Sequence, residues 1–147
     1  MNLRSNIVSV AVGGVVLAAA LAPAPAPADE SGLQQAIARG HEAFLHEHFG
    51  ASSGRVCDTC HSGGGRQPGM RPDGVPIPSL NNAATIFPRL DEDGQRLITL
   101  PDQVRACVGG AIGGKPPAYG SDALNALVAY VTSLSQGKPI DMGADPH

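Results

Sequence analysis

The stretch Cys57-Asp58-Thr59-Cys60-His61 determines both what this chain binds and how it folds. Two cysteines separated by two residues and followed directly by histidine are the attachment signature of a c-type haem. Each thiol adds to one vinyl group of the porphyrin, and the histidine supplies an axial ligand to the iron. The motif therefore predicts one covalently bound haem c, held by Cys57 and Cys60, with His61 as an iron ligand.

Other chemistry that uses a Cys-x-x-Cys pair fits the surrounding sequence less well. A thioredoxin-like dithiol needs a βαβ pattern around it, and the sequence does not show one. A tetrahedral zinc site needs a second pair of ligands, but the chain has just one further cysteine, Cys107. A structural disulfide would leave His61 without a role. Haem attachment is the interpretation that uses all three residues.

The N-terminus predicts a cleaved secretory signal. Arg4 supplies a positive charge, residues 7–21 are apolar, and an alanine-proline repeat follows at residues 22–28. The apolar run is shorter than the roughly 20 residues of a membrane-spanning helix. We therefore expect a signal peptide at residues 1–28 and a mature domain at residues 29–147 with no membrane span. Because covalent haem attachment takes place outside the cytoplasm, the expected location is the periplasm.

The composition of the mature region limits its size and its partners. It has 147 − 28 = 119 residues, which suffice for one small domain. Loss of Arg4 changes the formal charge from −3 to −4, so nucleic acid is not an expected partner. The sequence has no tryptophan and few aromatic residues, so a buried porphyrin would supply much of the apolar core. The 19 glycines and 13 prolines predict long loops around it.

Three segments show helical periodicity, and no segment shows the alternation of a strand, so the expected fold class is all-α. The helices are expected at residues 31–49, 99–108 and 121–136. Thr99 and Ser121 are the expected N-caps, Asp102 completes a capping box, and Gly137 follows the last helix. Gly/Pro-rich loops connect the helices, and the polar tail after Pro139 is expected to fray.

This order of features resembles a class I cytochrome c. The resemblance rests on Gly40-x-x-x-Phe44, the haem motif and Ala129-Tyr130-Val131. It implies a single domain whose first and last helices cross at the glycine, with the tyrosine beside the haem edge. More narrowly, the chain is similar to the SoxA-type cytochromes of bacterial sulfur oxidation and to related thiosulfate dehydrogenases. The segments that carry this similarity are residues 102–107, 114–117, 121–131 and 135–140.

The residues alone leave the sixth position of the iron open. The candidates for the distal ligand are Met70, Cys107, Met142, His41, His46 and His48. Met70 follows His61 by nine residues, which leaves little chain to wrap the porphyrin edge. Cys107 follows His61 by 46 residues, and an odd cysteine in an oxidising compartment is a liability unless it is paired or bound to a metal. It could also pack as a small apolar group.

The resemblance selects Cys107, because in the SoxA-type group the matching cysteine is the distal iron ligand. The sulfur would then be a thiolate. Arg105 lies two residues away and could balance that charge. Met70 is the rival ligand.

The axial ligands set the expected function. A methionine sulfur favours Fe(II), whereas a thiolate stabilises Fe(III), so ligation by His61 and Cys107 predicts a low-potential haem. We expect a periplasmic monohaem cytochrome that transfers electrons or binds NO or CO, with a redox partner such as a second cytochrome subunit. No catalytic residue is assigned. The alternative is the haem subunit of a SoxA-like thiosulfate-oxidising enzyme that uses Cys107. SoxA-type proteins commonly have two cytochrome domains, and the single haem motif here favours the first interpretation.

Overall fold

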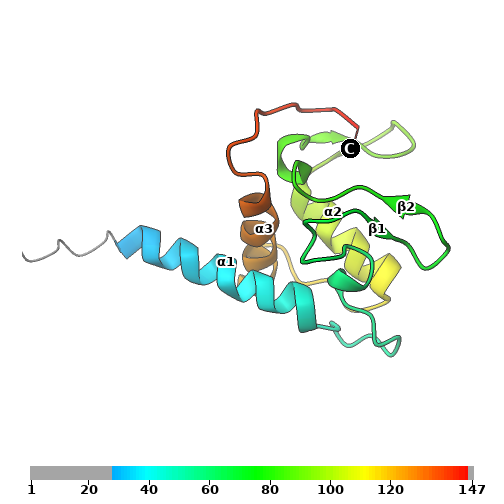
Figure 1. The fold of residues 1–147 in the computed structure, drawn as a ribbon, viewed down its shortest axis with the longest axis horizontal. Coiled ribbons are helices and arrows are strands. Elements are labelled where there is room, and N and C mark those ends of the chain that lie inside the picture. Colours follow the sequence, from blue (N-terminus) through cyan, green and yellow to red (C-terminus); the bar gives the residue numbers. More distant parts are fainter. Residues whose placement is uncertain (1–27, 146–147) are drawn as a thin grey trace, which may run out of the picture.

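The computed structural model describes residues 28–145 (Figure 1). It contains the helices α1 (Ala28–His46), α2 (Leu100–Cys107) and α3 (Asp122–Leu134), the short helical turns η1 (Cys57–Thr59), η2 (Ala83–Thr85) and η3 (Val108–Ile112), and the strands β1 (Gly69–Met70), β2 (Pro76–Ile77), β3 (Arg89–Leu90) and β4 (Leu97–Ile98). The strands form two antiparallel pairs of two residues each, β1 with β2 and β3 with β4. The mostly helical architecture that the sequence predicts is confirmed. Apart from its last residue, the expected signal peptide lies outside the described residues.

Helix α1 crosses α3 at Gly40 (Figure 1). A Cβ atom on Gly40 would lie 2.0 Å from the backbone oxygen of Ala126 and 2.8 Å from the Cβ atom of Tyr130. Carbon atoms in contact need more than 3 Å, so a residue with any side chain would push the helices apart. The crossing at the glycine, which the resemblance to cytochromes c implies, is confirmed.

The apolar core lies where α1, α2 and α3 meet. Its buried side chains are Phe44, Leu100, Leu127, Tyr130, Val131 and Leu134. The ring of Phe44 packs edge-on against that of Tyr130, with centroids 5.4 Å apart. The buried positions of α3 recur at three- and four-residue spacing, so burial of this stripe against α1 explains why the segment is helical.

Side-chain caps set the starts of α2 and α3. The Ser121 hydroxyl accepts a hydrogen bond from the N–H of Leu124 at 3.3 Å. The Asp102 carboxylate accepts one from the N–H of Thr99 at 2.8 Å, and the Thr99 hydroxyl accepts from the N–H of Asp102. Both predicted caps are confirmed. Helix α3 ends at Leu134, two residues earlier than expected.

Two segments differ from expectation. Helix α1 ends at His46 instead of residue 49, because Phe49 has a φ of 51° and turns the chain out of the helix. The tail after α3 is not frayed throughout. The N–H groups of Asp141 and Gly143 donate to the carbonyls of Thr85 and Ile86, each at 2.9 Å. Among the described residues, no helix is long and apolar enough to cross a membrane.

Replacing Gly40 with alanine should destabilise the protein by about 3 kcal/mol, because the new Cβ atom collides with α3 backbone that cannot move alone. Gly32→Ala is the matched control. Gly32 lies in the same helix, and a Cβ atom there would have no neighbour within 4 Å, so alanine should stabilise the protein by about 0.5–1 kcal/mol. Urea unfolding followed by circular dichroism measures both changes. Equal midpoints for the two variants would contradict the tight crossing.

Candidate haem site

The residues of the Cys-x-x-Cys-His motif lie within one tight turn. Helical turn η1 contains Cys57, and the N–H of His61 donates to the Cys57 carbonyl at 3.0 Å. Cys60 is buried, and Cys57 and His61 are half-buried. The turn thus presents two thiols and one imidazole from a short stretch of backbone, which is the donor set that covalent haem attachment uses.

Cys107, at the end of α2, lies close to both attachment cysteines. Burial raises the pKa of the Cys57 thiol to about 12, and the charge on Cys107 is the next cause. Burial also raises the pKa of Cys107; a hydrogen bond from Gln103 opposes that shift, and the charge on Cys60 adds to it. Electrostatic effects between thiols weaken with distance, so these effects indicate that the three side chains share one region of the fold. The fold therefore brings together three sulfurs from two elements that are 47 residues apart in sequence, from Cys60 to Cys107.

The His61 imidazole is half-buried and favours its neutral form. Burial lowers its pKa below the usual value, and the carboxylate of Asp58 partly offsets that effect. Its Nδ1 atom is buried and has no hydrogen-bond partner in the described part of the chain. A neutral imidazole retains the lone pair with which histidine binds metals. An unpaired buried nitrogen is costly in a protein-only interior. Together with one buried and two half-buried thiols, it fits a covalently bound haem.

The described residues contain no disulfide and no cluster of metal-ligating side chains. All three cysteines are free thiols there. No group of three or more His, Cys, Asp or Glu side chains within residues 28–145 could hold a metal ion by itself, as a zinc site would require.

A glycine run carries the chain away from the motif. Gly63, Gly64 and Gly65 have φ values of 65°, 65° and 81°, a conformation that favours glycine. The N–H of Gly64 donates to the Asp58 carboxylate at 2.7 Å, and its carbonyl accepts from the Tyr130 hydroxyl at 2.7 Å. The last helix is thereby tied to the loop beside the haem motif.

Strand β1 packs directly on the attachment turn, a contact that sequence reasoning does not foresee. A Cβ atom on Gly69 would lie 1.7 Å from the carbonyl oxygen of Cys60. The N–H of Met70 donates to the same oxygen at 3.1 Å, yet the Met70 side chain is 53% exposed. The rival ligand therefore belongs to the segment that lines the motif, with its side chain open to solvent.

The remaining distal candidates lie on the surface or have other partners. Met142 is exposed, as are His46 and His48. The ring of His48 lies 3.2 Å from the Arg55 carbonyl oxygen, measured from Nδ1. His41 packs against the Tyr130 ring, with centroids 4.9 Å apart.

The side chain that reaches the Cys107 sulfur is Gln103 and not Arg105. The Gln103 Nε2 atom lies 3.6 Å from Cys107 Sγ. Arg105 instead donates to the Pro117 carbonyl and lies over the Tyr119 ring, 4.2 Å from its centroid. Arg105 thus anchors the loop after α2. The expectation that Arg105 balances the charge of a Cys107 thiolate is wrong, because its guanidinium is directed to Pro117 and Tyr119. A spacing of four residues places Gln103 and Cys107 on one helix face, and this signal could have identified Gln103 from sequence.

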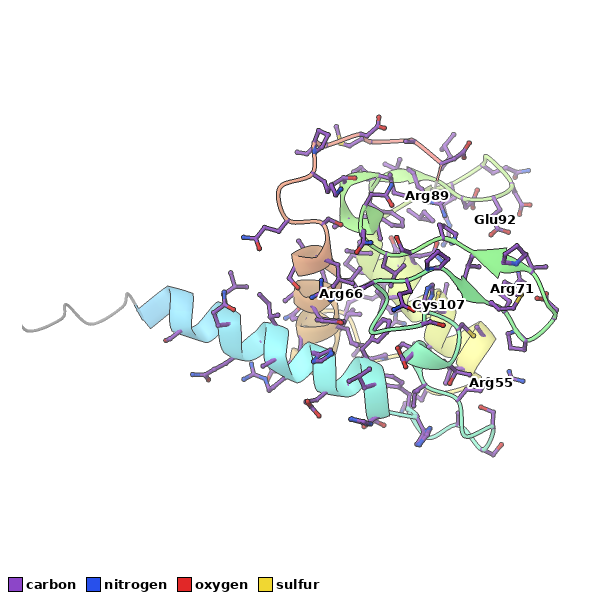
Figure 2. All side chains as sticks on the ribbon, in the orientation of Figure 1. Arg55, Arg66, Arg71, Arg89, Glu92 and Cys107 are labelled. Carbon is purple, nitrogen blue, oxygen red and sulfur yellow. The ribbon has the colours of Figure 1, made fainter. Side chains whose placement is uncertain are left out.

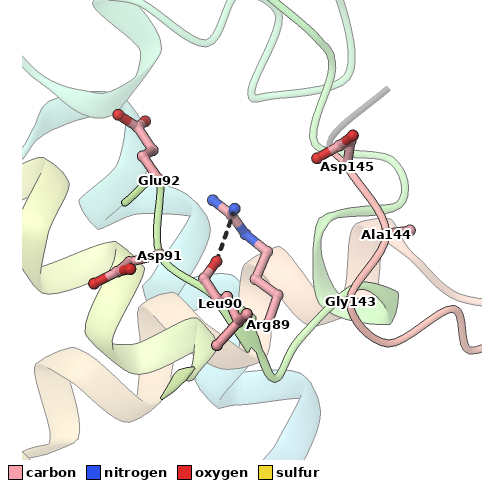
Figure 3. Close-up of a pocket in the computed structure, with 7 residues that line it drawn as sticks. All are labelled: Arg89, Leu90, Asp91, Glu92, Gly143, Ala144 and Asp145. Carbon is pink, nitrogen blue, oxygen red and sulfur yellow. Dashed lines mark hydrogen bonds between the residues drawn. The ribbon is translucent and has the colours of Figure 1, made fainter. Parts of the chain in front are cut away.

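Two cavities lie beside the β3–β4 hairpin, and no residue of the haem motif lines either of them. One, of about 570 Å³, is bounded by residues 89–92 and 143–145 (Figure 3). The other, of about 260 Å³, extends from Arg89 on β3 to Ala106 on α2. Carboxylates outnumber the guanidinium groups in both linings, so neither cavity favours an anion.

A mostly helical fold with a Cys-x-x-Cys-His turn beside the crossing of its first and last helices defines a c-type cytochrome domain. The family model for the SoxA/TsdA cytochrome c domain matches residues 39–140. The chain belongs to this family, and a cytochrome c domain implies covalently bound haem c.

Curated relatives are thiosulfate dehydrogenases. That of Allochromatium vinosum is 29% identical over 124 residues, or 80% of this chain and 44% of the relative. That of Stutzerimonas stutzeri is 30% identical over 98 residues, or 67% of this chain and 29% of the relative. That of Psychrobacter arcticus is 27% identical over 89 residues, or 60% of this chain and 25% of the relative. The matched part of this chain spans less than half the length of each.

Two solved structures share the fold. Thiosulfate dehydrogenase (TsdBA) from Marichromatium purpuratum, in its as-isolated form, matches with a TM-score of 0.58 and 24% identity over 84% of this chain and 28% of that one. SoxXA from P. pantotrophus matches with a TM-score of 0.60 and 20% identity over 80% of this chain and 39% of that one.

Tyr130→Phe should lower the free energy of unfolding by about 1–2 kcal/mol, because the buried Gly64 carbonyl loses its hydrogen-bond donor. Tyr119→Phe is the comparison, since the Tyr119 hydroxyl is exposed and donates to the exposed Asp102 carboxylate. Its removal should change stability by no more than about 0.5 kcal/mol. Urea midpoints of the haem-loaded variants measure both. A Tyr130 variant as stable as the Tyr119 variant would mean that the tie between α3 and the glycine run contributes little.

Proposed function

We propose that this chain is a periplasmic monohaem cytochrome c whose iron is bound by His61 and Cys107. The observation that carries the proposal is the half-buried Cys107 thiol at the end of α2, which accepts a hydrogen bond from Gln103 and interacts electrostatically with both attachment cysteines. Cys107 comes from α2, an element separate from the attachment turn, as suits a ligand for the opposite face of the ring. Met70 is hydrogen-bonded through its backbone to the turn itself, and its side chain faces solvent.

When bound, the haem supplies one-electron chemistry, and the protein sets its potential through the axial ligands. With His61 and Cys107 as the residues that would hold the iron, the negative charge on the sulfur would stabilise Fe(III). The protein would then suit low-potential electron transfer or the binding of NO or CO.

The proposed partner is a redox protein, such as a second cytochrome subunit. The structural neighbours TsdBA and SoxXA are multi-subunit complexes, which supports a partner subunit. On this chain, Leu90 and Leu97 pair across β3 and β4 and are both exposed, beside the acidic turn at residues 91–93. An apolar pair next to carboxylates suits a partner whose docking face is apolar and basic.

The second candidate is the haem subunit of a thiosulfate-oxidising enzyme that uses Cys107. The curated relatives with this activity in their names favour it. The chain matches less than half of the length of these relatives, so their activity comes to this chain only as a proposal.

Electron paramagnetic resonance of the ferric protein tests the ligation. Cys107→Met should abolish a low-spin thiolate signal and raise the reduction potential, because a neutral sulfur favours Fe(II). Met70→Leu, the matched control, should leave both unchanged. If Met70→Leu alters the signal and Cys107→Met does not, Met70 is the ligand and the protein is a high-potential electron carrier.

Thiosulfate oxidation with ferricyanide as acceptor separates the two candidate functions. We expect no turnover by the haem-loaded chain alone, since nothing in the described cavities favours an anion. Turnover by the wild type that disappears in Cys107→Ala would instead establish the enzyme.

A further inference from the structure

Gln103 connects the Cys107 sulfur to a cation on another element, Arg89. Figure 2 labels Arg89 and Cys107. The Gln103 Nε2 atom lies 3.6 Å from Cys107 Sγ, within reach of a hydrogen bond to sulfur. Its Oε1 atom lies 3.4 Å from Nη2 of Arg89, which belongs to β3. Three residues from β3 and α2 thus form one line of contacts that ends at the sulfur.

The chemistry of Arg89 determines which way the Gln103 amide points. A guanidinium has donors and no acceptor, so the amide atom that faces it must be the oxygen. The amide nitrogen then faces Cys107, where a sulfur can accept its hydrogen. With Arg89 replaced by an apolar residue, either orientation of the amide would be available to Gln103.

Arg89 is itself fixed in place. Its Nη1 donates to the Leu90 carbonyl at 3.3 Å, as Figure 3 shows, and its guanidinium lies over the Phe87 ring, 5.4 Å from the centroid. Its Nε atom is buried and has no hydrogen-bond partner in the described part of the chain. A cation held this firmly at the outer end of the line polarises the amide toward the sulfur at the inner end.

We propose that Gln103 is a positioning residue for the distal ligand. Oriented by Arg89, it donates a hydrogen bond to the Cys107 thiolate, draws electron density from the sulfur and so weakens its donation to the iron. This inference rests on the proposed ligation by Cys107. Hydrogen bonds to a ligating sulfur are a known means of tuning a metal centre, and loss of one leaves the thiolate a stronger donor that favours Fe(III) more.

The test uses the haem-loaded protein with Gln103→Leu, which removes the donor at similar volume. We expect the thiolate signal in electron paramagnetic resonance to persist with shifted g-values. The reduction equilibrium should move roughly five- to tenfold toward Fe(III), the contribution of one hydrogen bond of ordinary net strength. Arg89→Met should move the reduction equilibrium the same way but less. Arg89→Lys keeps the positive charge, so it should move the equilibrium less than Arg89→Met does. Gln95→Leu is the matched control, because Gln95 is exposed on the β3–β4 turn.

A second variant, Gln103→Glu, keeps the side chain's shape and places a carboxylate oxygen next to the sulfur. Gln103→Glu should move the reduction equilibrium toward Fe(III) at least as far as Gln103→Leu does. It also tests the inference if the leucine variant does not fold. Wild-type g-values and potential in both Gln103 variants would overturn the inference. If Cys107→Met alone changes the signal, the ligation stands and the role of Gln103 fails. If Cys107→Met also leaves the signal unchanged, the ligation itself is wrong.

Discussion

The contact between Gly40 and the backbone of Ala126 is the constraint on which the site depends. It lets α1 and α3 approach until Phe44, one turn further along α1, meets the ring of Tyr130. Phe44 also lies beside His61, with ring centroids 6.3 Å apart, and the hydroxyl of Tyr130 bonds to Gly64 just past the motif. Because Gly40 has no side chain, α1 and α3 can approach closely, and this approach sets the position of the attachment turn relative to both helices.

The second half of the site depends on how α2 begins and ends. A capping box at Thr99 starts the helix, and Cys107 is its last residue. A turn of π-helix, η3, follows at once, and such turns are frequent at functional sites. Arg105 secures the next loop through Pro117 and Tyr119, so the sulfur is held between two restrained segments.

Much of this arrangement can be predicted because it is local in the sequence. The haem motif, the stripe of α3 and the caps at Thr99 and Ser121 involve residues a few positions apart, where spacing determines geometry. Two contacts cannot be predicted in this way: that of Gly69 with Cys60 and that of Arg89 with Gln103. Loops without periodicity bring these partners together. The direction of Arg105 is missed for another reason. Two residues of separation on a helix point side chains apart, whereas the four between Gln103 and Cys107 align them.

The crossing of the first and last helices also has a consequence for biogenesis. Gly40 and Ala126 are separated by 126 − 40 = 86 residues, so the core cannot close until nearly the whole domain has been delivered. Until then no docked α3 covers Phe44, and no Tyr130 hydroxyl ties down the glycine run after the motif. Cys57 packs against this core, so docking of the final helix completes its surroundings. Because α3 comes last in the chain, haem can be attached to the motif before α3 packs against α1 and completes the core.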